Sequence, residues 1–317
     1  MRKHIKIGTR ASLLAVTQSS WVKAQIEKHH PGTTVELVKI TTTGDKILDV
    51  PLAKVGGKGL FVKELEDALL DGRADLAVHS MKDVPTELPD ELHLGVVTER
   101  ENPRDAFIAN KYPDIAALPQ GAKVGTSSLR RKSQLARLRP DLVIEDLRGN
   151  LDTRLRKLDE GLYDAIILAA AGLNRLGFAD RITTLFDPEQ MLPAIGQGAL
   201  GLELRRDDQE LLAGISFLNH PATAIAVTAE RAFLLRLEGG CQVPIGAYAR
   251  YEEGTLTMDA MVGSVDGRRI VREQLCGDAG QPEALGEAMV ERLLRLGAGA
   301  ILSEIRDADD VDGLLKT

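Results

Sequence analysis

The chain has 317 residues, of which 44% are hydrophobic and 27% are charged, and its formal net charge is -7. This composition indicates a globular protein of two or three domains and excludes a low-complexity or collagen-like chain. The acidic balance argues against nucleic acid or an anionic membrane as a partner, because both bind through a basic face. No stretch of the sequence reaches the ~20 apolar residues of a membrane span.

The two cysteines, Cys241 and Cys276, are too few for a disulfide framework, which favours a cytoplasmic location. The N-terminus lacks the apolar run of a signal peptide. Cysteines and histidines show no metal-ligand spacing, and no glycine motif of nucleotide-binding loops is present, so we expect neither a metal nor a nucleotide site. No long apolar seam is evident, which favours a monomer.

Short apolar runs alternate with amphipathic stretches over the first two-thirds of the chain. The pattern predicts strands at residues 4–8, 34–40 and 75–79, and helices at about 12–30 and 60–70. This βαβ alternation predicts mainly parallel sheets covered by helices. A long segment rich in Gly and Lys, residues 41–59, interrupts the pattern and is either a lid over a site or a plain surface loop.

Two pairs of segments are similar to each other. KIGTRASL at 6–13 resembles KVGTSSL at 123–129, and DGRADLAV at 71–78 resembles EGLYDAII at 160–167. We interpret them as two α/β lobes of one plan, the alternative being chance recurrence of common turns. The first lobe would span 1–98 with 198–216, including a returning strand at 200–204, and the second 99–197. Such lobes face each other across a cleft.

The last third of the chain changes character. It predicts a helix at 223–237, strands at 245–250, 255–262 and 269–275, and a closing helix at 284–296. The Glu-Gly and Asp-Gly turns between the strands indicate an antiparallel sheet. The predicted fold class is therefore α/β, with two similar lobes plus a smaller C-terminal α+β domain over 217–317.

Several basic residues lie where strands are predicted to end or helices to begin. Free N–H groups at such positions favour anions, and arginine adds bidentate pairing to carboxylates. These residues are Arg10, Lys82, Arg130, Arg131, Arg148 and Arg154. They predict a cleft for a small polyanion, although each could be a solvated helix-face charge. Nearby Ser and Thr hydroxyls either cap helices or donate to a ligand.

Asp83 and Cys241 are candidates for chemistry. Asp83 follows a buried strand beside Lys82, and an ionised carboxylate there can balance a developing cation or accept a proton. A turn-forming Asp before Pro85 is the alternative. Cys241 follows two glycines, which leave the thiol accessible for a covalent role, although a lone Cys is often a small buried hydrophobe. Cys276 follows the predicted strand at 269–275, and we expect it to have a structural role.

Long motifs throughout the chain resemble the porphobilinogen deaminase family. They are IGTRASLLA at 7–15, KGLFVKELE at 58–66, AVHSMKDVP at 77–85, GTSSLRR at 125–131, LRGNLDTR at 147–154, LPAIGQGAL at 192–200 and GGCQVP at 239–244. The resemblance implies three α/β-type domains, of which the first two are like a bilobal, periplasmic-binding-protein-like anion binder. It also implies that four porphobilinogen molecules are condensed with loss of ammonia, and that water releases hydroxymethylbilane.

The resemblance further assigns roles to residues. Cys241 would carry a dipyrromethane cofactor through a thioether, and Asp83 would be the catalytic residue. The cofactor would be held by Lys82, Thr126, Ser128, Arg130, Arg131, Arg148 and Arg154. The substrate would be bound by Arg10, Ser12, Gln18, Arg148, Arg154 and Gln197, and Lys54 and Lys58 would belong to a lid.

Two other functions share parts of this pattern. A non-catalytic bilobal module for small anions would have the lobes and the arginines, but no use for an accessible Cys241 or a third domain. A thiol hydrolase or acyl transferase would use Cys241 as nucleophile and needs a base. None of the six histidines lies in a recognisable Cys/His motif.

Overall fold

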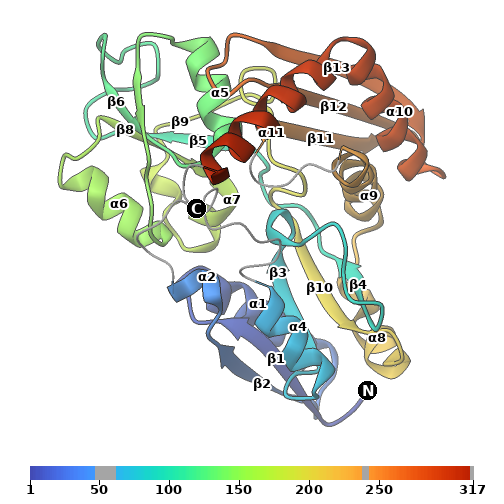
Figure 1. Cartoon of the computed structure of the whole chain (residues 1–317). Coiled ribbons are helices and arrows are strands. Elements are labelled where there is room, and N and C mark those ends of the chain that lie inside the picture. The colour runs from blue at the N-terminus through green and yellow to red at the C-terminus, as the bar shows by residue number, and fades with distance from the viewer. Residues whose placement is uncertain (47–61, 238–242, 315–317) are drawn as a thin grey trace.

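The computed structural model describes residues 1–46, 62–237 and 243–314. They form three sheets, two of five strands and one of three, each with its own helices (Figure 1). The two five-stranded sheets are mixed α/β layers, and the three-stranded sheet is antiparallel. The predicted fold class, two α/β lobes plus a C-terminal α+β domain, is confirmed.

The sheet of the first lobe has the strand order β2-β1-β3-β10-β4. Its strands are β1 (His4–Arg10), β2 (Thr34–Ile40), β3 (Leu76–Ser80), β4 (Leu92–Val97) and β10 (Leu200–Arg205). β1 pairs in parallel with β2 and β3, whereas β10 runs antiparallel to β3 and β4. The predicted return of the strand at 200–204 to the first lobe is confirmed, and it makes the sheet mixed.

The sheet of the second lobe has the order β7-β6-β8-β5-β9. Its strands are β5 (Asp105–Ile108), β6 (Lys123–Gly125), β7 (Val143–Glu145), β8 (Ala165–Ala169) and β9 (Thr184–Leu185). β6 is parallel to β7 and β8, and β5 is antiparallel to β8 and β9. This is the arrangement of the first lobe, with β5 in the place of β10, and it supports the proposed repeat.

The two lobes also share a side-chain contact at equivalent positions. The Oδ2 atom of Asp75 accepts a hydrogen bond from the backbone N–H of Lys6 at 2.8 Å. In the second lobe, Oδ2 of Asp164 accepts from the N–H of Lys123, also at 2.8 Å. Each Asp lies just before a buried strand and fixes the start of the neighbouring strand. The similarity of the two sequence segments therefore corresponds to one structural device used twice.

Helices cover both faces of each lobe's sheet. The first lobe has α1 (Leu13–His29), α2 (Thr43–Lys46), α4 (Lys63–Leu70) and α8 (Gln209–Ile215), and the second has α5 (Leu129–Leu138), α6 (Leu151–Asp159) and α7 (Ala170–Arg175). One core of the first lobe joins Ile26 of α1 and Leu211 of α8, and another contains Leu65 of α4. In the second lobe, Leu135 of α5 and Leu155 of α6 lie in separate cores. Short 3-10 helices are Met81–Asp83, Ala179–Arg181 and Ser216–Leu218.

The C-terminal domain packs three helices on an antiparallel sheet. Its elements are α9 (Pro221–Arg236), β11 (Ile245–Glu252), β12 (Thr255–Gly263), β13 (Ile270–Asp278), α10 (Pro282–Arg295) and α11 (Ala298–Leu314). Phe233, Met289 and Ile301 bring α9, α10 and α11 into one core. The prediction that the helix at 284–296 closes the chain is wrong, because α11 follows a turn at Gly297, where φ is +101°.

The domain boundaries remain a proposal. Ile215 and Leu218 pack in the core of the first lobe, while Ala226 packs in the C-terminal core. We therefore place the last boundary between 218 and 221 rather than at the predicted 216/217. Within the described part of the chain, no single helix is long and apolar enough to cross a membrane. By length and composition alone, one bent pair, Gln209–Leu218 with Pro221–Arg236, passes the same test.

Candidate active site

A pocket opens at the C-terminal ends of β1 and β3 in the first lobe. It is lined by Arg10, Ser12, Leu14, Ala15, Gln18, Val62, Val78, His79, Ser80 and Asp83. The structure thus brings together four of the predicted site residues, Arg10, Ser12, Gln18 and Asp83. The Oγ atom of Ser12 caps α1 by accepting from the N–H of Ala15 at 3.4 Å. Gln18 is buried and its Nε2 donates to Ser80 Oγ at 3.0 Å.

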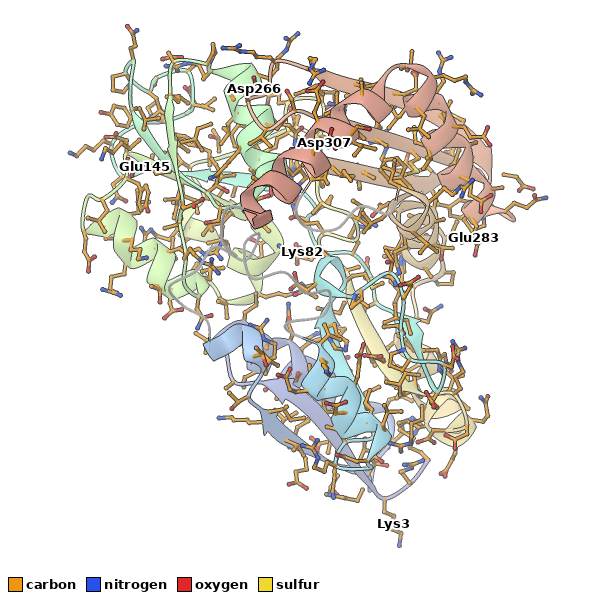
Figure 2. All side chains as sticks on the ribbon, viewed as in Figure 1. Lys3, Lys82, Glu145, Asp266, Glu283 and Asp307 are labelled. Carbon is orange, nitrogen blue, oxygen red and sulfur yellow. The ribbon has the colours of Figure 1, made fainter. Side chains whose placement is uncertain are left out.

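Lys82 and Asp83 lie on the short 3-10 helix that follows β3. Met81 anchors this helix, because its side chain is buried and its N–H donates to the carbonyl of Ala199 at 3.0 Å. Both Lys82 and Asp83 have exposed side chains. Figure 2 shows Lys82 in the middle of the molecule, where the first lobe faces the other two sheets. The turn therefore presents a cation and a carboxylate to the space between the lobes.

The charge of Lys82 is perturbed by groups from both lobes. Its side chain is exposed, yet enough protein lies around its ammonium to desolvate it. This desolvation lowers the pKa of Lys82 to about 8, with Asp83 acting in the opposite direction and Arg131 adding to the lowering. Arg131 belongs to α5 of the second lobe, so the interlobe space is where these charges meet.

Arg154 brings further positive charge to the same place. It lies in α6, and its Nε donates to the carbonyl of Gly149 at 2.7 Å. Burial, followed by repulsion from Arg131 and Arg148, lowers the pKa of Arg154 to about 10, and Asp83 opposes this. This repulsion shows that the guanidinium groups of Arg131, Arg148 and Arg154 lie close enough to interact. Such a cluster is suited to a ligand with several carboxylates.

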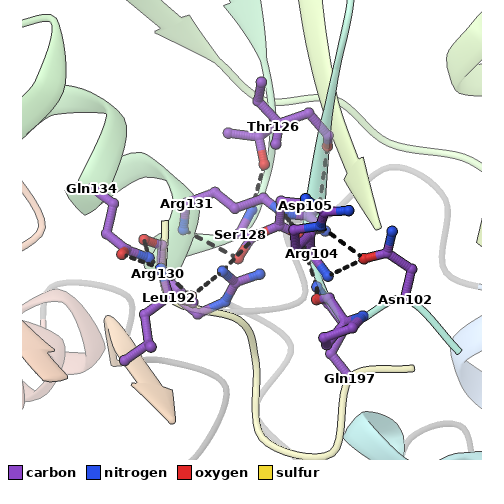
Figure 3. A network of polar contacts seen from close by, with 12 residues as sticks. Asn102, Arg104, Asp105, Thr126, Ser128, Arg130, Arg131, Gln134, Leu192 and Gln197 are labelled. Atoms are coloured by element: carbon purple, nitrogen blue, oxygen red, sulfur yellow. Dashed lines mark hydrogen bonds and ion pairs between the residues drawn. The ribbon is translucent and has the colours of Figure 1, made fainter. Parts of the chain in front are cut away.

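Beneath these groups lies a buried network centred on Asp105, at the start of β5 (Figure 3). Oδ2 of Asp105 accepts from Nη1 of Arg130 at 2.7 Å, and Oδ1 accepts from Nε and Nη2 of Arg131 at 3.1 and 2.8 Å. Arg130 and Arg131 also donate to the carbonyls of Leu192 and Ile167. Burial alone would raise the pKa of Asp105, but the two guanidinium groups hold it well below its usual range.

Three other predicted residues support this network. Gln197 is buried, and its Nε2 donates to the carbonyl of Pro103 at 2.6 Å and to Asp105 Oδ1 at 3.0 Å. Thr126 Oγ1 accepts from the N–H of Ser128 at 3.3 Å, and Ser128 Oγ caps α5 by accepting from the N–H of Arg131 at 3.4 Å. The contacts of Thr126 and Ser128 fix the start of α5. Direct contact of these residues with a ligand stays a prediction.

Sequence reasoning missed Asp105. It lies in the run Asn102-Pro103-Arg104-Asp105-Ala106-Phe107, and this run predicts a loop before a short apolar strand. The available signal was an acidic residue at the first position of an otherwise apolar strand, where a buried cation is the expected partner.

Other predicted residues fall elsewhere. Cys241, Lys54 and Lys58 lie outside the described residues. Within the described ranges, no group of three or more His, Cys, Asp or Glu side chains is arranged to hold a metal ion.

Fold and site together define a protein with two α/β lobes that bring guanidinium and ammonium groups near the exposed carboxylate of Asp83. Residues 5–213 match the family model described as "Porphobilinogen deaminase, dipyromethane cofactor binding domain". Residues 224–295 match "Porphobilinogen deaminase, C-terminal domain". The chain belongs to the porphobilinogen deaminase family, which confirms the resemblance drawn from its motifs.

Curated relatives match over nearly the full chain. A porphobilinogen deaminase from Geobacter sulfurreducens is 59% identical over 95% of this chain and 94% of its own length. One from Geobacter metallireducens is 58% identical over 96% of this chain and 95% of its own.

Among solved structures, the methionine-binding protein MetQ covers 68% of this chain and 89% of its own, with 16% identity and a TM-score of 0.45. A lipoprotein from Bacillus subtilis covers 69% of this chain and 90% of its own, with 11% identity and a TM-score of 0.42.

Proposed function

We propose that this chain is a transferase that condenses four porphobilinogen molecules head to tail. Each condensation releases one ammonia, and water finally releases hydroxymethylbilane. Family membership and a relative of 59% identity named porphobilinogen deaminase support this assignment. The single structural observation that carries it is the position of Asp83 among cations of both lobes, Lys82 and Arg154 above all. Porphobilinogen bears acetate and propionate groups, so a growing chain is a polyanion that these cations would neutralise.

The residues present fit a dipyrromethane cofactor. The pKa values of Lys82 and Arg154 are lowered in this site. A cofactor carboxylate close to either residue would stabilise its charged form, so the acidic side chains of the cofactor complement these cations. When bound, the cofactor supplies the pyrrole carbon at which the first new unit is joined. We propose that Cys241 holds it through a thioether and that Lys82, Arg148 and Arg154 bind its carboxylates. Thr126, Ser128, Arg130 and Arg131 would shape this side of the cleft.

We propose that the pocket of the first lobe binds the incoming porphobilinogen. Arg10, Ser12 and Gln18 line it together with Asp83. In this arrangement, Asp83 would stabilise the cation that forms as ammonia leaves. It would also accept the proton lost when the new ring regains aromaticity. Gln197 would act behind the pocket through Asp105. Lys54 and Lys58 are proposed lid residues.

The test is intact-mass measurement together with turnover of porphobilinogen. The purified protein should exceed its sequence mass by two linked pyrrole units, and Cys241→Ala should remove that excess. Incubation with porphobilinogen should release ammonia and form the linear tetrapyrrole. A protein at sequence mass that binds porphobilinogen without consuming it would instead be a non-catalytic anion-binding module.

We also propose that the protein is a cytoplasmic monomer. The use of only two cysteines supports a reducing compartment. Cys276 is exposed and makes no disulfide among the described residues. Light scattering of the purified protein tests the monomer, since a dimer mass would contradict it. Fractionation of the source cells tests the location.

A further inference from the structure

Arg231 of α9 binds the chain segment that directly follows Asp83. Its Nη2 donates to the carbonyls of Pro85 at 2.6 Å and Thr86 at 3.4 Å, and its Nη1 donates to the carbonyl of Val84 at 3.2 Å. This segment is neither helix nor strand, and Pro85 has no N–H to offer a neighbour. A single side chain of the C-terminal domain thus satisfies three successive carbonyls of the first lobe.

Apolar packing on the same helix face strengthens this contact. Val227 lies one helical turn before Arg231 and is buried in a small core with Met81 and Val84. Met81 and Val84 flank Lys82 and Asp83 in sequence. Two residues of α9 therefore fix the chain around the exposed Lys82–Asp83 pair. Val227 packs with the residues that flank the pair, and Arg231 binds the backbone that follows it.

The helix that carries Arg231 is itself firmly fixed. The neighbouring residue, Glu230, is fully buried and pairs with Nη2 of Arg100 at 2.8 Å. Its carboxylate also accepts from the N–H groups of Gly196 at 2.6 Å and Ala249 at 2.8 Å. Arg100 and Gly196 lie on the two chain crossings between the lobes, and Ala249 lies on β11. Arg231 therefore lies on a helix that Glu230 connects to both chain crossings and to the C-terminal sheet.

We infer that Arg231 is a positioning residue that sets the location of Asp83 for the condensation step. It acts through the backbone of Val84, Pro85 and Thr86, and it touches neither substrate nor cofactor. The inference rests on the proposed function, because it assumes that Asp83 serves the reaction. Since Arg10, Ser12 and Gln18 belong to other elements, loss of Arg231 should disturb the chemical step more than substrate binding.

The experiment compares the holoenzyme with Arg231→Met and Arg231→Lys. We expect kcat to fall about 10- to 100-fold in Arg231→Met, while KM for porphobilinogen stays within about threefold of its normal value. Arg231→Lys keeps a positive charge but cannot reach all three carbonyls, so its kcat should lie between. Intact mass should show a complete primer in each variant. Hydrogen exchange of the peptide that spans 81–88 should be faster in both.

Arg139→Met is the matched control. Arg139 also donates to three loop carbonyls, those of Ile115, Ala116 and Leu118, in the second lobe. Its loss should lower thermal stability without changing kcat or the exchange of 81–88. A kcat within twofold of normal in Arg231→Met, or an equal loss of kcat in Arg139→Met, would overturn the inference. A wild-type protein that does not consume porphobilinogen would overturn the proposed function instead.

Discussion

Asp105 holds Arg131 through two hydrogen bonds to one carboxylate oxygen, Oδ1, which accepts from Nε at 3.1 Å and from Nη2 at 2.8 Å. Its other oxygen serves Arg130. One buried carboxylate therefore balances one of two buried guanidinium charges. Together with the carbonyls of Leu192 and Ile167, it fixes both arginine side chains inside the second lobe.

This relationship predicts the cost of removing the carboxylate. Asp105→Asn would leave two guanidinium groups buried without a counter-charge, so we expect a loss of about 3–5 kcal/mol in the free energy of unfolding. Urea denaturation at pH 7 measures it. Asp71→Asn removes an exposed carboxylate paired with Arg73 and should leave the unfolding midpoint unchanged. Equal midpoints for the two variants would contradict the role of Asp105.

The same contact has a defined pH dependence. The pKa of Asp105 is depressed in the folded protein, so its stabilising effect is complete above the unfolded pKa of about 3.9. The effect is lost as the pH falls below that value toward the folded pKa. The stability difference between the normal protein and Asp105→Asn should therefore be constant from pH 5 to 7 and shrink in stronger acid.

Arg131 and Arg148 should respond differently to substitution by leucine. Arg131→Leu breaks half of the Asp105 network, so it should cost about 3 kcal/mol of stability and impair primer assembly together. Arg148 is half-buried and is not part of the Asp105 network. Arg148→Leu should therefore lower the melting temperature less than Arg131→Leu does, while slowing primer assembly or elongation. Calorimetry and product formation from porphobilinogen separate the two cases, and normal rates in Arg148→Leu would contradict the carboxylate-binding role.

Lys82 offers a direct measure of the electrostatics of the cleft. Its pKa of about 8 applies to the protein without a ligand, so Lys82 is mostly charged at pH 7 and mostly neutral at pH 9. In Cys241→Ala, which we expect to lack the primer, the rate at which an amine-reactive reagent labels Lys82 should be half-maximal near pH 8. In the loaded protein, nearby primer carboxylates should move that midpoint upward. Identical midpoints would show that Lys82 does not face the primer.

Much of the fold followed from local pattern. The strand at 34–40 was predicted with its observed bounds. The two similar segment pairs predicted two lobes of one plan, and the strand orders of their sheets match. The paired Gly72 and Gly161 both adopt positive φ, +77° and +76°, which explains why the same helix stop recurs in both sequences. α11 was missed because Gly297 marked a stop without showing that a further helix follows.

The candidate site was predictable in its residue types but not in its internal contacts. Arg130 and Arg131 were predicted to line the cleft, yet each is only 5% exposed. Their burial is possible because both pair with Asp105, which lies on a strand more than twenty positions earlier. No local periodicity encodes such a partner. The same limit applies to Arg231, which acts on Val84 through a contact between domains. Polar contacts between residues far apart in the sequence depend on how the strands, helices and domains pack. The local pattern of a single sequence does not reveal that packing.

Asp83 is the most direct test of the proposed chemistry. Its side chain is exposed and makes no hydrogen bond to any described residue, so Asp83→Ala should keep the normal melting temperature. Turnover should fall by about 10²–10³-fold, because the cation formed on loss of ammonia would no longer face a carboxylate. Asp83→Asn is the matched variant, since it keeps the shape and removes the charge. Steady-state turnover of porphobilinogen in both variants decides: if Asp83→Asn turns over at the normal rate, the negative charge has no part in the reaction.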